Sequence, residues 1–504
     1  MGIKMNKLHR NNKLIKAFLA ASISLGFFTM PACTDLEEKV YDKVPTDSFG
    51  SNQEQLDALV GPLYSSLGDY FSRYVELNVS TDDMVIPTRG GDWKDGDKWR
   101  RMHQHTWNPT QDDGIFNSVW SWVYNNVTSI NQQLQNEQIA ANAGTVAELR
   151  TLRAFYHYIA MDNFGNVIIA DNISTEAKGQ KSRAEVYAWI EKELTEALPN
   201  LSEDVGGPKY GRMNKYVAHM ILAKLYLNAQ VYTGTPQWQK VVSNCDVIIN
   251  SGKYTLADNF FSNFSVNNEG SPEIILATPM DKSKRTGMNI QMRTLHYRNQ
   301  LTYNLGVSPW NGYCTLPEFY NSFEDKDIRK QMWMVGQQYD ASGNPLMDDN
   351  VPLVFTVEIP SFEMPAGPTA RLAGARSQKY EIQRNNNNAD QDNDFVIYRL
   401  ADVYMMRGEA KLRLGNTADA LTDVNFIRTK RGVDAFTTLN LDMLLAERGR
   451  EFAWEFHRRQ DLIRFGEFGK AWTFKPASDA NRTLFPIPTS QIALNSNLKQ
   501  NPGY

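Results

Sequence analysis

Two short amphipathic helices separated by a marked turn are predicted between Tyr398 and Gly432, and this unit constrains the fold more than any other. The apolar residues of the first helix recur every three or four positions and so share one face: Leu400, Val403, Met406, Ala410 and Leu414. Gly415 can supply the left-handed end of that helix, and Asn416 or Thr417 can cap the next. Because neither helix can bury its apolar face alone, the sequence predicts further helices packed against them.

The same pattern recurs in other parts of the chain. Apolar helical stripes are predicted in residues 56–67, 116–134, 149–164, 186–194, 217–225 and 238–249. Ser182 and Glu185 form a capping box in front of the fourth of these. A helix-turn-helix of about 34 residues is the unit of tetratricopeptide-like arrays, which need neighbouring copies to close a core. We therefore predict a mostly α fold, with a helical scaffold over residues 52–253 and 395–470.

Two stretches break the helical pattern. Residues 80–110 form a long, glycine-broken segment that contains Trp93, Trp99 and Trp107. A long segment without periodicity is usually functional or disordered, and disorder does not favour so many aromatic residues. Residues 254–394 are rich in Gly, Pro and Asn, with short strands predicted at 274–276 and 351–359. This second stretch is predicted to be an irregular, loop-rich insertion that a rigid helical scaffold supports.

Charge and cysteine content exclude some classes of function. The 504 residues carry a formal net charge of −4, and because residues 1–32 are basic, the remainder is near −9. Proteins that bind nucleic acid normally show a basic patch or stripe, so nucleic acid is not an expected partner. Apart from Cys33, only Cys245 and Cys314 are present, too few for a disulfide framework. Cys245 lies in an apolar helical stripe and is predicted to be core.

The N-terminus has the features of a secretion signal. An apolar run from Ala17 to Phe28, too short to span a bilayer, follows five basic residues: Lys4, Lys7, Arg10, Lys13 and Lys16. Ala32 followed by Cys33 resembles a bacterial lipoprotein signal, which implies removal of residues 1–32 and a lipid on the Cys33 thiol. The acidic tract at residues 35–38 resembles an export tag for the outer face of the outer membrane. The alternative is an ordinary cleaved signal with an incidental cysteine.

The C-terminal segment completes a resemblance to a known family. Carboxylates and guanidinium groups recur at spacings of three and four between Glu447 and Gly466, so they can pair along a helix. Phe485-Pro486-Ile487-Pro488 and a terminal Asn501-Pro502-Gly503-Tyr504 follow. Read with the earlier motifs, this order resembles the SusD/RagB family of outer-membrane lipoproteins from Bacteroidetes: the Cys33 signal, the Leu152–Tyr156 helix, the Ser182 helix, Tyr226–Tyr254, Arg399 and Glu409-Ala410.

This resemblance implies a nutrient-binding protein that works with a SusC-like TonB-dependent transporter of the outer membrane. The resemblance implies that the protein covers the transporter barrel as a lid. Its helix pairs would face the transporter, and its irregular region would present the ligand site. The implied domain is residues 33–504, with the ligand-binding insertion at residues 254–394. The implied ligand is an oligo- or polysaccharide at the cell exterior. Peptide binding of the RagB kind and a structural adaptor without a ligand site are the alternatives.

The resemblance places the ligand site in two loop regions, residues 82–99 and 310–314. Stacking of a sugar ring needs flat aromatic faces with hydrogen-bonding neighbours. The candidate ligand-binding residues are the platforms Trp93 and Trp310, the further rings Trp99 and Tyr313, the neighbouring Cys314, and the hydrogen-bonding groups Asp82, Asp83, Asn311 and Arg384. A neutral glycan is the expected ligand, because aspartates are interleaved with the basic residues near the tryptophans.

Catalytic interpretations fit the sequence less well. Glu447, Glu451 and Glu455 could suggest a carboxylate pair for glycoside hydrolysis, but they lie among Arg residues at pairing distance, which favours ion pairs. His103 and His105 alternate as on a strand, and without a third ligand they form a weak metal site. The sequence shows no nucleophile elbow, P-loop or dinucleotide motif, so we expect neither an enzyme nor a cofactor or metal.

Acylation of Cys33 is directly testable. Cys33→Ala should move the protein from the membrane fraction to the soluble fraction, because the thiol that carries the lipid is gone. Cell fractionation together with incorporation of a labelled fatty acid measures this. Unchanged membrane retention of the variant, with no label in the wild type, would contradict the prediction.

Overall fold

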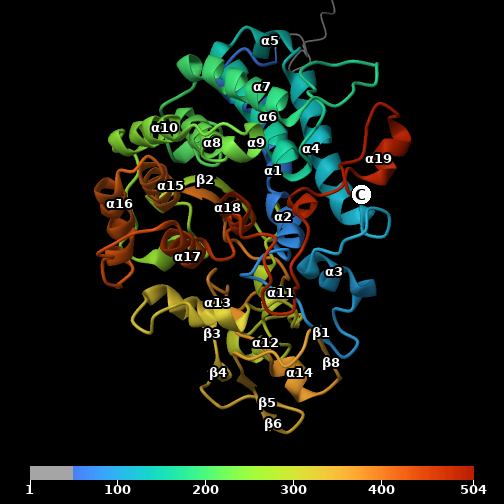
Figure 1. The fold of residues 1–504 in the computed structure, drawn as a ribbon, viewed down its shortest axis with the longest axis vertical. Helices are drawn as coiled ribbons and strands as arrows, with labels where there is room; N and C mark the ends of the chain where they lie inside the picture. The colour runs from blue at the N-terminus through green and yellow to red at the C-terminus, as the bar shows by residue number, and fades with distance from the viewer. Residues whose placement is uncertain (1–48) are drawn as a thin grey trace, which may run out of the picture. The chain divides into compact units, whose positions relative to one another are not determined.

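Helix pairs that lie side by side form the scaffold of the computed structural model, which describes residues 49–504 (Figure 1). The pairs are α6 (Ala143–Phe164) with α7 (Arg183–Ala197), α8 (Lys215–Leu227) with α10 (Trp238–Asn250), α15 (Leu400–Arg413) with α16 (Thr417–Lys430), and α17 (Leu441–Phe452) with α18 (Arg458–Phe465). Successive pairs also touch, because α7 packs on α8 and α10 packs on α15. The predicted fold class, a mostly α array of tetratricopeptide-like helix pairs, is confirmed.

Further helices precede the array at its N-terminal end: α1 (Gln53–Leu67), α2 (Tyr70–Asn78), α4 (Asp113–Gln133) and α5 (Glu137–Ala140). The short helix α9 (Ala229–Thr233) follows α8 and packs against α7 and α18. The C-terminal helix α19 (Thr489–Leu494) packs against α4, and the Thr489 backbone N–H donates to Asp113 at 2.6 Å. The helical scaffold therefore continues past residue 470, where the sequence pattern placed its end. Residues 1–48, with the predicted signal and Cys33, lie outside the described residues.

The helix ends carry most of the capping features that the sequence predicts. The Ser182–Glu185 capping box is present, and Gly415 has the left-handed backbone expected of a helix stop, with φ +86°. Asn416 is the N-cap of α16, although its side chain makes no capping hydrogen bond. The prediction that Leu414 belongs to the core is wrong. Leu414 is the C-cap of α15 and is 41% exposed.

The lower part of Figure 1 is irregular, and every sheet among residues 49–504 is two-stranded. The strands are β1 (Thr88–Arg89), β2 (Ile274–Thr278), β3 (Trp333–Met334), β4 (Gly336–Gln337), β5 (Met347–Asp348), β6 (Val351–Pro352), β7 (Val354–Phe355), β8 (Glu363–Met364), β9 (Arg376–Ser377) and β10 (Phe395–Arg399). The strand predicted at 274–276 is confirmed as β2. The single strand predicted at 351–359 is wrong in detail, since β6 and β7 pair with different partners.

Strand β10 is the element that the sequence pattern missed. It runs antiparallel to β2 with an irregular register and leads directly into α15. All five of its residues are buried, and so are all five of β2. The two strands therefore place a small sheet inside the helical array, and one large apolar core runs through both. Cys245, in the stripe of α10, is fully buried as predicted.

A second, smaller apolar cluster lies within the irregular region. It consists of Leu295, Tyr303, Leu305, Met334, Leu346, Leu353, Phe355, Leu372 and Ile382. Short helices complete this region: α11 (Ile290–Thr294), α12 (Asn299–Tyr303), α13 (Pro317–Asn321) and α14 (Pro368–Leu372). The cluster gives the loops a core of their own. Among residues 49–504, no helix is both long and apolar enough to cross a membrane.

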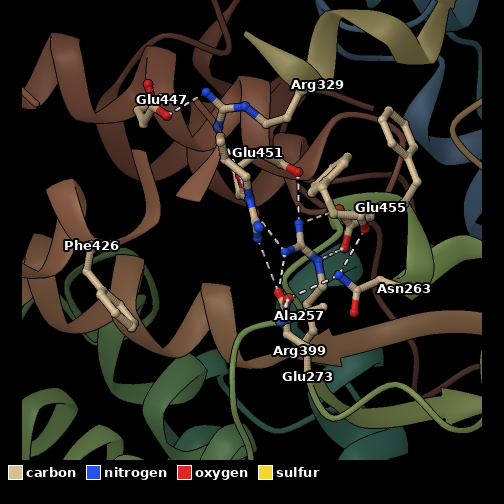
Figure 2. Close-up of polar contacts among 12 residues, drawn as sticks. Ala257, Asn263, Glu273, Arg329, Arg399, Phe426, Glu447, Glu451 and Glu455 are labelled. Carbon is tan, nitrogen blue, oxygen red and sulfur yellow. Dashed lines mark hydrogen bonds and ion pairs between the residues drawn. The ribbon is translucent and has the colours of Figure 1, made fainter. Parts of the chain in front are cut away.

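A buried ion-pair network joins β2 and β10 to the last helices (Figure 2). Arg399, at the end of β10, has no exposed surface. Its Nε donates to Glu455 at 2.7 Å, and its Nη1 donates to Glu273 at 2.7 Å and to Glu451 at 2.8 Å. Its Nη2 donates to the Glu451 carbonyl and to the Glu455 carboxylate, both at 2.8 Å. All five N–H donors of the guanidinium are thus used.

Glu451, in α17, is the acceptor at the centre of this network. Besides Arg399 it accepts from Arg329 at 2.9 Å and from Arg431 at 2.9 Å. Burial alone would raise its pKa, yet the guanidinium groups of Arg431, Arg399 and Arg329 hold that pKa well below its usual range. The neighbouring Glu447, which pairs with Arg329 at 2.8 Å, has a pKa lowered to about 2. The prediction that these carboxylates form ion pairs is confirmed. The prediction that the pairs run along one helix is wrong, because the segment is divided into α17 and α18 and the partners of Glu451 come from other elements.

Removing the central charge should destabilise the protein strongly. In Glu451→Gln, three buried guanidinium groups lose their shared counter-charge, and breaking a buried pair in this way costs about 3–5 kcal/mol. Urea unfolding followed by circular dichroism measures the loss. Glu196→Gln is the matched control, because Glu196 is about half exposed and pairs with Arg150 at the surface, so its loss should change stability little. Equal stability of the two variants would contradict the role of the network.

Candidate ligand-binding site

Two loops that are distant in sequence meet at Trp93 and Trp310. The Trp93 indole Nε1 donates to the Trp310 backbone carbonyl at 2.7 Å. Trp310 is 36% exposed, which is unusual for so large an apolar ring, and Trp93 is half-buried. The predicted juxtaposition of residues 82–99 with residues 310–314 is therefore present in the structure.

Further aromatic rings support this pair from the interior. The Trp93 ring lies 5.4 Å from Tyr313 in an edge-to-face arrangement and 6.1 Å from Trp99. Trp99 is 3% exposed and Tyr313 is fully buried, so both pack beneath the surface in this structure. Edge-to-face contacts between aromatic rings contribute to stability beyond the area they bury. We call the surface formed by Trp93 and Trp310 the aromatic platform.

The backbone that carries Trp93 is strained. Trp93, Asp95 and Asp97 all have positive φ angles, of 59°, 38° and 64°, within five residues. Non-glycine residues rarely adopt this region, and each such position costs free energy that neighbouring contacts must offset. The indole N–H of Trp99, in α3 (Lys98–Gln104), donates to the Asp95 carboxylate at 2.6 Å and helps to hold the turn. Strain of this kind is typical of backbone that places a side chain for binding.

Backbone pairing fixes the two loops onto the scaffold. Val85 and Cys314 form an antiparallel bridge with N–H to carbonyl distances of 2.8 and 3.0 Å. Strand β1 pairs with β8 in parallel, which aligns Thr88 with Glu363. Glu363 in turn accepts from Lys94 at 2.7 Å at the surface. Main-chain hydrogen bonds therefore hold both loops in place, in addition to the side-chain contacts of the two indoles.

Gly312 sets the distance between the two loops. A Cβ built at this position would lie 2.3 Å from the Trp93 ring, closer than side chains ever approach. The indole thus packs directly on the backbone of the second loop. Any larger residue at position 312 has to displace Trp93.

Two buried guanidinium groups lie beneath the platform without a carboxylate in contact. Arg89 contacts the Gly312 carbonyl at 3.4 Å and the Cys314 sulfur at 3.5 Å, and Arg376 donates to the Asn311 side chain at 2.9 Å. Neither forms an ion pair within residues 49–504. Burial lowers the pKa of both, that of Arg376 to about 9 with a contribution from the nearby Arg89 charge. Both guanidinium groups remain protonated at neutral pH, so two positive charges are buried beneath the platform.

The other candidate residues lie elsewhere or point inward. Asp82 accepts both nitrogens of the Arg458 fork at 2.6 and 2.7 Å and is only partly exposed. The side chains of Asp83, Asn311 and Cys314 have no exposed surface, and Asp83 accepts from the Trp454 backbone N–H at 3.1 Å. These three groups brace the loops and do not reach solvent in this structure.

Arg384 is exposed but belongs to a different surface. It donates to the Thr302 carbonyl at 2.8 Å and lies 5.0 Å from the centre of the Tyr303 ring. The structure does not bring it to Trp93 or Trp310.

The two histidines considered as metal ligands are buried and differently placed. His103 lies inside α3 and His105 is its C-cap, so the prediction that they alternate on a strand is wrong. Burial lowers the pKa of His103 to about 4, which keeps the ring neutral, and the ring bonds to the Thr473 carbonyl at 2.9 Å. Among the described residues, no group of three or more His, Cys, Asp or Glu side chains could hold a metal ion.

Sequence analysis missed Arg293, Tyr297 and Asp92. The Arg293 carbonyl accepts from both Gly312 and Tyr313 at 2.8 Å, and its guanidinium lies 5.8 Å from the Trp310 ring. The Tyr297 hydroxyl donates to Asp92, and burial followed by this carboxylate raises the pKa of Tyr297 to about 12. No motif marks these residues, because their roles depend on contacts between segments that are distant in sequence.

Comparisons with known proteins agree on both ends of the chain. A family model described as "Starch-binding associating with outer membrane" matches residues 36–227, and one described as "SusD family" matches residues 369–504. The starch-binding protein SusD of Bacteroides thetaiotaomicron is 26% identical over 457 residues, which cover 79% of this chain and 82% of that protein. SusD-like protein P2 of Formosa agariphila is 23% identical over 518 residues, covering 94% of this chain and 97% of that one.

Solved structures show the same fold. A SusD-like protein from Bacteroides fragilis superposes with a TM-score of 0.74 at 21% identity, covering 91% of this chain and 99% of that one. Surface glycan-binding protein A from Bacteroides thetaiotaomicron, in complex with laminarihexaose, superposes with a TM-score of 0.73 at 20% identity, covering 89% and 99%.

An array of helix pairs in which each pair packs on the next places the chain in the class of helical-repeat proteins. Within that class, the chain belongs to the SusD family.

Proposed function

We propose that this protein is a cell-surface lipoprotein that captures an oligo- or polysaccharide and delivers it to a TonB-dependent transporter. The observation that carries the proposal is the aromatic platform, where an exposed indole at Trp310 is held beside Trp93 by loops far apart in sequence. Relatives named for binding starch and laminarihexaose support a glycan as the ligand.

The chemistry of the platform suits a sugar. The apolar face of a sugar ring can stack on an indole, while its hydroxyls reach polar groups at the edge. The Tyr297 hydroxyl donates to the carboxylate of Asp92, which precedes Trp93 in the chain. Lys94, which follows Trp93, is exposed. Stacking and hydrogen bonding need neither an acid nor a nucleophile.

The buried carboxylates of α17 and the segment after it support a binding protein and not a glycoside hydrolase. Glu447, Glu451 and Glu455 are fully buried and paired with Arg and Lys side chains. Glycoside hydrolysis needs two carboxyl groups that flank an accessible bond, with one of them protonated. A buried carboxylate held at a low pKa by guanidinium groups fits neither requirement.

Association with the outer membrane and with a transporter completes the proposal. The family description names association with the outer membrane, and Cys33 is the proposed point of lipid attachment. The helix pairs offer a large rigid surface apart from the platform loops, which suits a second role in contacting a membrane partner (Figure 1).

Loss of the exposed indole should weaken glycan binding without unfolding the protein. Trp310→Ala should lower affinity about ten- to a hundredfold, equivalent to about 1–3 kcal/mol, because a stacking surface is removed. Isothermal titration with the glycan found by affinity-gel screening measures this, and thermal melts check the fold.

Two further variants sharpen this test. Gly312→Ala should also weaken binding, because it displaces Trp93 while keeping every ring. Phe426→Ala is the matched control, since Phe426 is an aromatic residue with 40% exposure on α16, away from the loops. If Trp310→Ala binds like the wild type, the ligand does not stack on this platform.

The transporter partnership has its own test. The tagged, full-length protein extracted in mild detergent should bring an outer-membrane barrel with it, and Trp310→Ala should retain that barrel, because the proposed contact uses the helix pairs. Mass spectrometry of the purified complex identifies the partner. Recovery of the protein alone, under conditions that keep other membrane complexes intact, would contradict delivery to a transporter.

A further inference from the structure

A polar groove lies in the irregular region at Arg384. It consists of one hollow of about 560 Å³ and a second of about 430 Å³, and both are lined by Tyr303, Gln378 and Arg384. Each volume lies in the range of about 300–1,000 Å³ that is typical of small-molecule sites. The two hollows are neighbours that share these three residues, and we call them together the Arg384 groove.

The walls of the groove carry polar groups that have no partner. The Nη1 of Arg384 donates to the Thr302 carbonyl at 2.8 Å, and its Nε and Nη2 make no hydrogen bond with any described residue. Within the same described part of the chain, the Gln331 side-chain amide and the Gln378 side-chain oxygen are also unbonded. Gln378 is positioned by its own amide nitrogen, which donates to the Gln331 carbonyl at 2.9 Å. These groups are therefore available to a ligand.

Aromatic surface accompanies the free polar groups. Tyr339 lines the second hollow, is 49% exposed, and has a hydroxyl without a partner among residues 49–504. Phe261 lines the first hollow and is half-buried, and the Arg384 guanidinium lies over Tyr303 between them. Amides, a guanidinium and ring faces in one trough are the groups that recognise alternating hydroxyls and C–H faces of a saccharide.

Another hollow of the same region shows the contrast. The hollow of about 640 Å³ beside β6 and α14 is lined mainly by Val, Pro and Leu residues, including Val351, Val354 and Leu372. It offers apolar surface and almost no side-chain donors. The Arg384 groove is thus distinguished by its chemistry and not by its size.

The groove is separate from the aromatic platform. None of its lining residues forms a hydrogen bond or a ring contact with Trp93 or Trp310 in the described chain. Figure 1 draws β3 and β4, next to the groove, on the left of the lower part, and α3 and β1, next to the platform, on the right. One short oligosaccharide bound at the platform therefore leaves the groove free.

We propose that the Arg384 groove is a second saccharide-binding site, so that one chain of this protein holds a polysaccharide at two places. The inference rests on the proposed glycan-binding function and adds a second site to it. Two linked contacts on one polymer raise the overall affinity well above that of either alone, by a factor of about 10²–10⁴ when the geometry allows both. The groove would thus select long chains over short fragments.

Native affinity gels containing starch, laminarin, xylan, mannan, pectin or chondroitin sulfate identify the polymer that retards the wild-type protein. Isothermal titration with the hexasaccharide of that polymer then counts the sites. The wild type should bind two hexasaccharides per chain. Arg384→Ala and Tyr339→Ala should each bind one, and should lose at least tenfold in affinity for the polymer.

The variants are chosen so that misfolding does not explain the result. The Tyr339 side chain is 49% exposed and forms no hydrogen bond or ring contact within residues 49–504, so Tyr339→Ala should melt close to the wild type. Lys209→Ala is the matched control, because Lys209 lines a comparable polar hollow of about 680 Å³ that has no aromatic ring in its wall. It should keep two sites and full affinity for the polymer.

The outcomes separate this inference from the proposed function. A wild type that binds one hexasaccharide, lost in Trp310→Ala and unaffected in Arg384→Ala and Tyr339→Ala, overturns the second site and leaves glycan binding intact. Two sites that both survive the groove substitutions also overturn it. A wild type that none of the six polymers retards, or that binds peptides in their place, overturns the inference together with the proposed function.

Discussion

The guanidinium of Arg399 is the group on which the rest of the structure depends. It ends β10 and begins α15, and its five donors tie that junction to β2 through Glu273 and to α17 through Glu451. Burying such charges is costly, and a hydrophobic cluster of equal volume would often be as stable. The ion pairs also fix the geometry of the junction. A planar guanidinium group whose five donors are all used accepts only one arrangement of its partners. We infer that the network sets the position of the irregular region on the helical array.

That fixed position explains how a strained loop can be kept. The left-handed residues Trp93, Asp95 and Asp97 persist because backbone bonds to β8 and to the 310–314 loop hold both sides of the turn. The Trp310 ring itself contributes little to the core, since it is one of the few exposed large apolar side chains. The scaffold therefore provides the stability, and the platform is free to serve binding.

The sequence predicted what is local and missed what is not. The stripe of α15 and the Ser182 capping box follow from local spacings of three and four residues, so they could be predicted. That Glu451 forms ion pairs was predicted too, but its partners Arg329, Arg399 and Arg431 are distant in sequence and could not be named. Strand β10 was missed because its apolar run merges with the helix that follows. Asp83 and Asn311 were expected to face a ligand, yet they are buried, because loops carry no periodicity from which to infer the direction of a side chain. Arg293 could not be found, since its role exists only once two distant loops meet.

Relatives with about one residue in five in common share this fold over nearly its whole length. The helical array can therefore persist while most side chains differ, and the array alone does not specify a ligand. In the proposed function, specificity comes from groups that reach solvent in the loops, and we propose Trp310 at the platform and Arg384 and Tyr339 at the groove for this role. Two separate polar and aromatic surfaces on one rigid body impose a spacing as well as a chemistry. A ligand that meets both must be a long chain of the right conformation, which is a stricter requirement than either surface could impose alone.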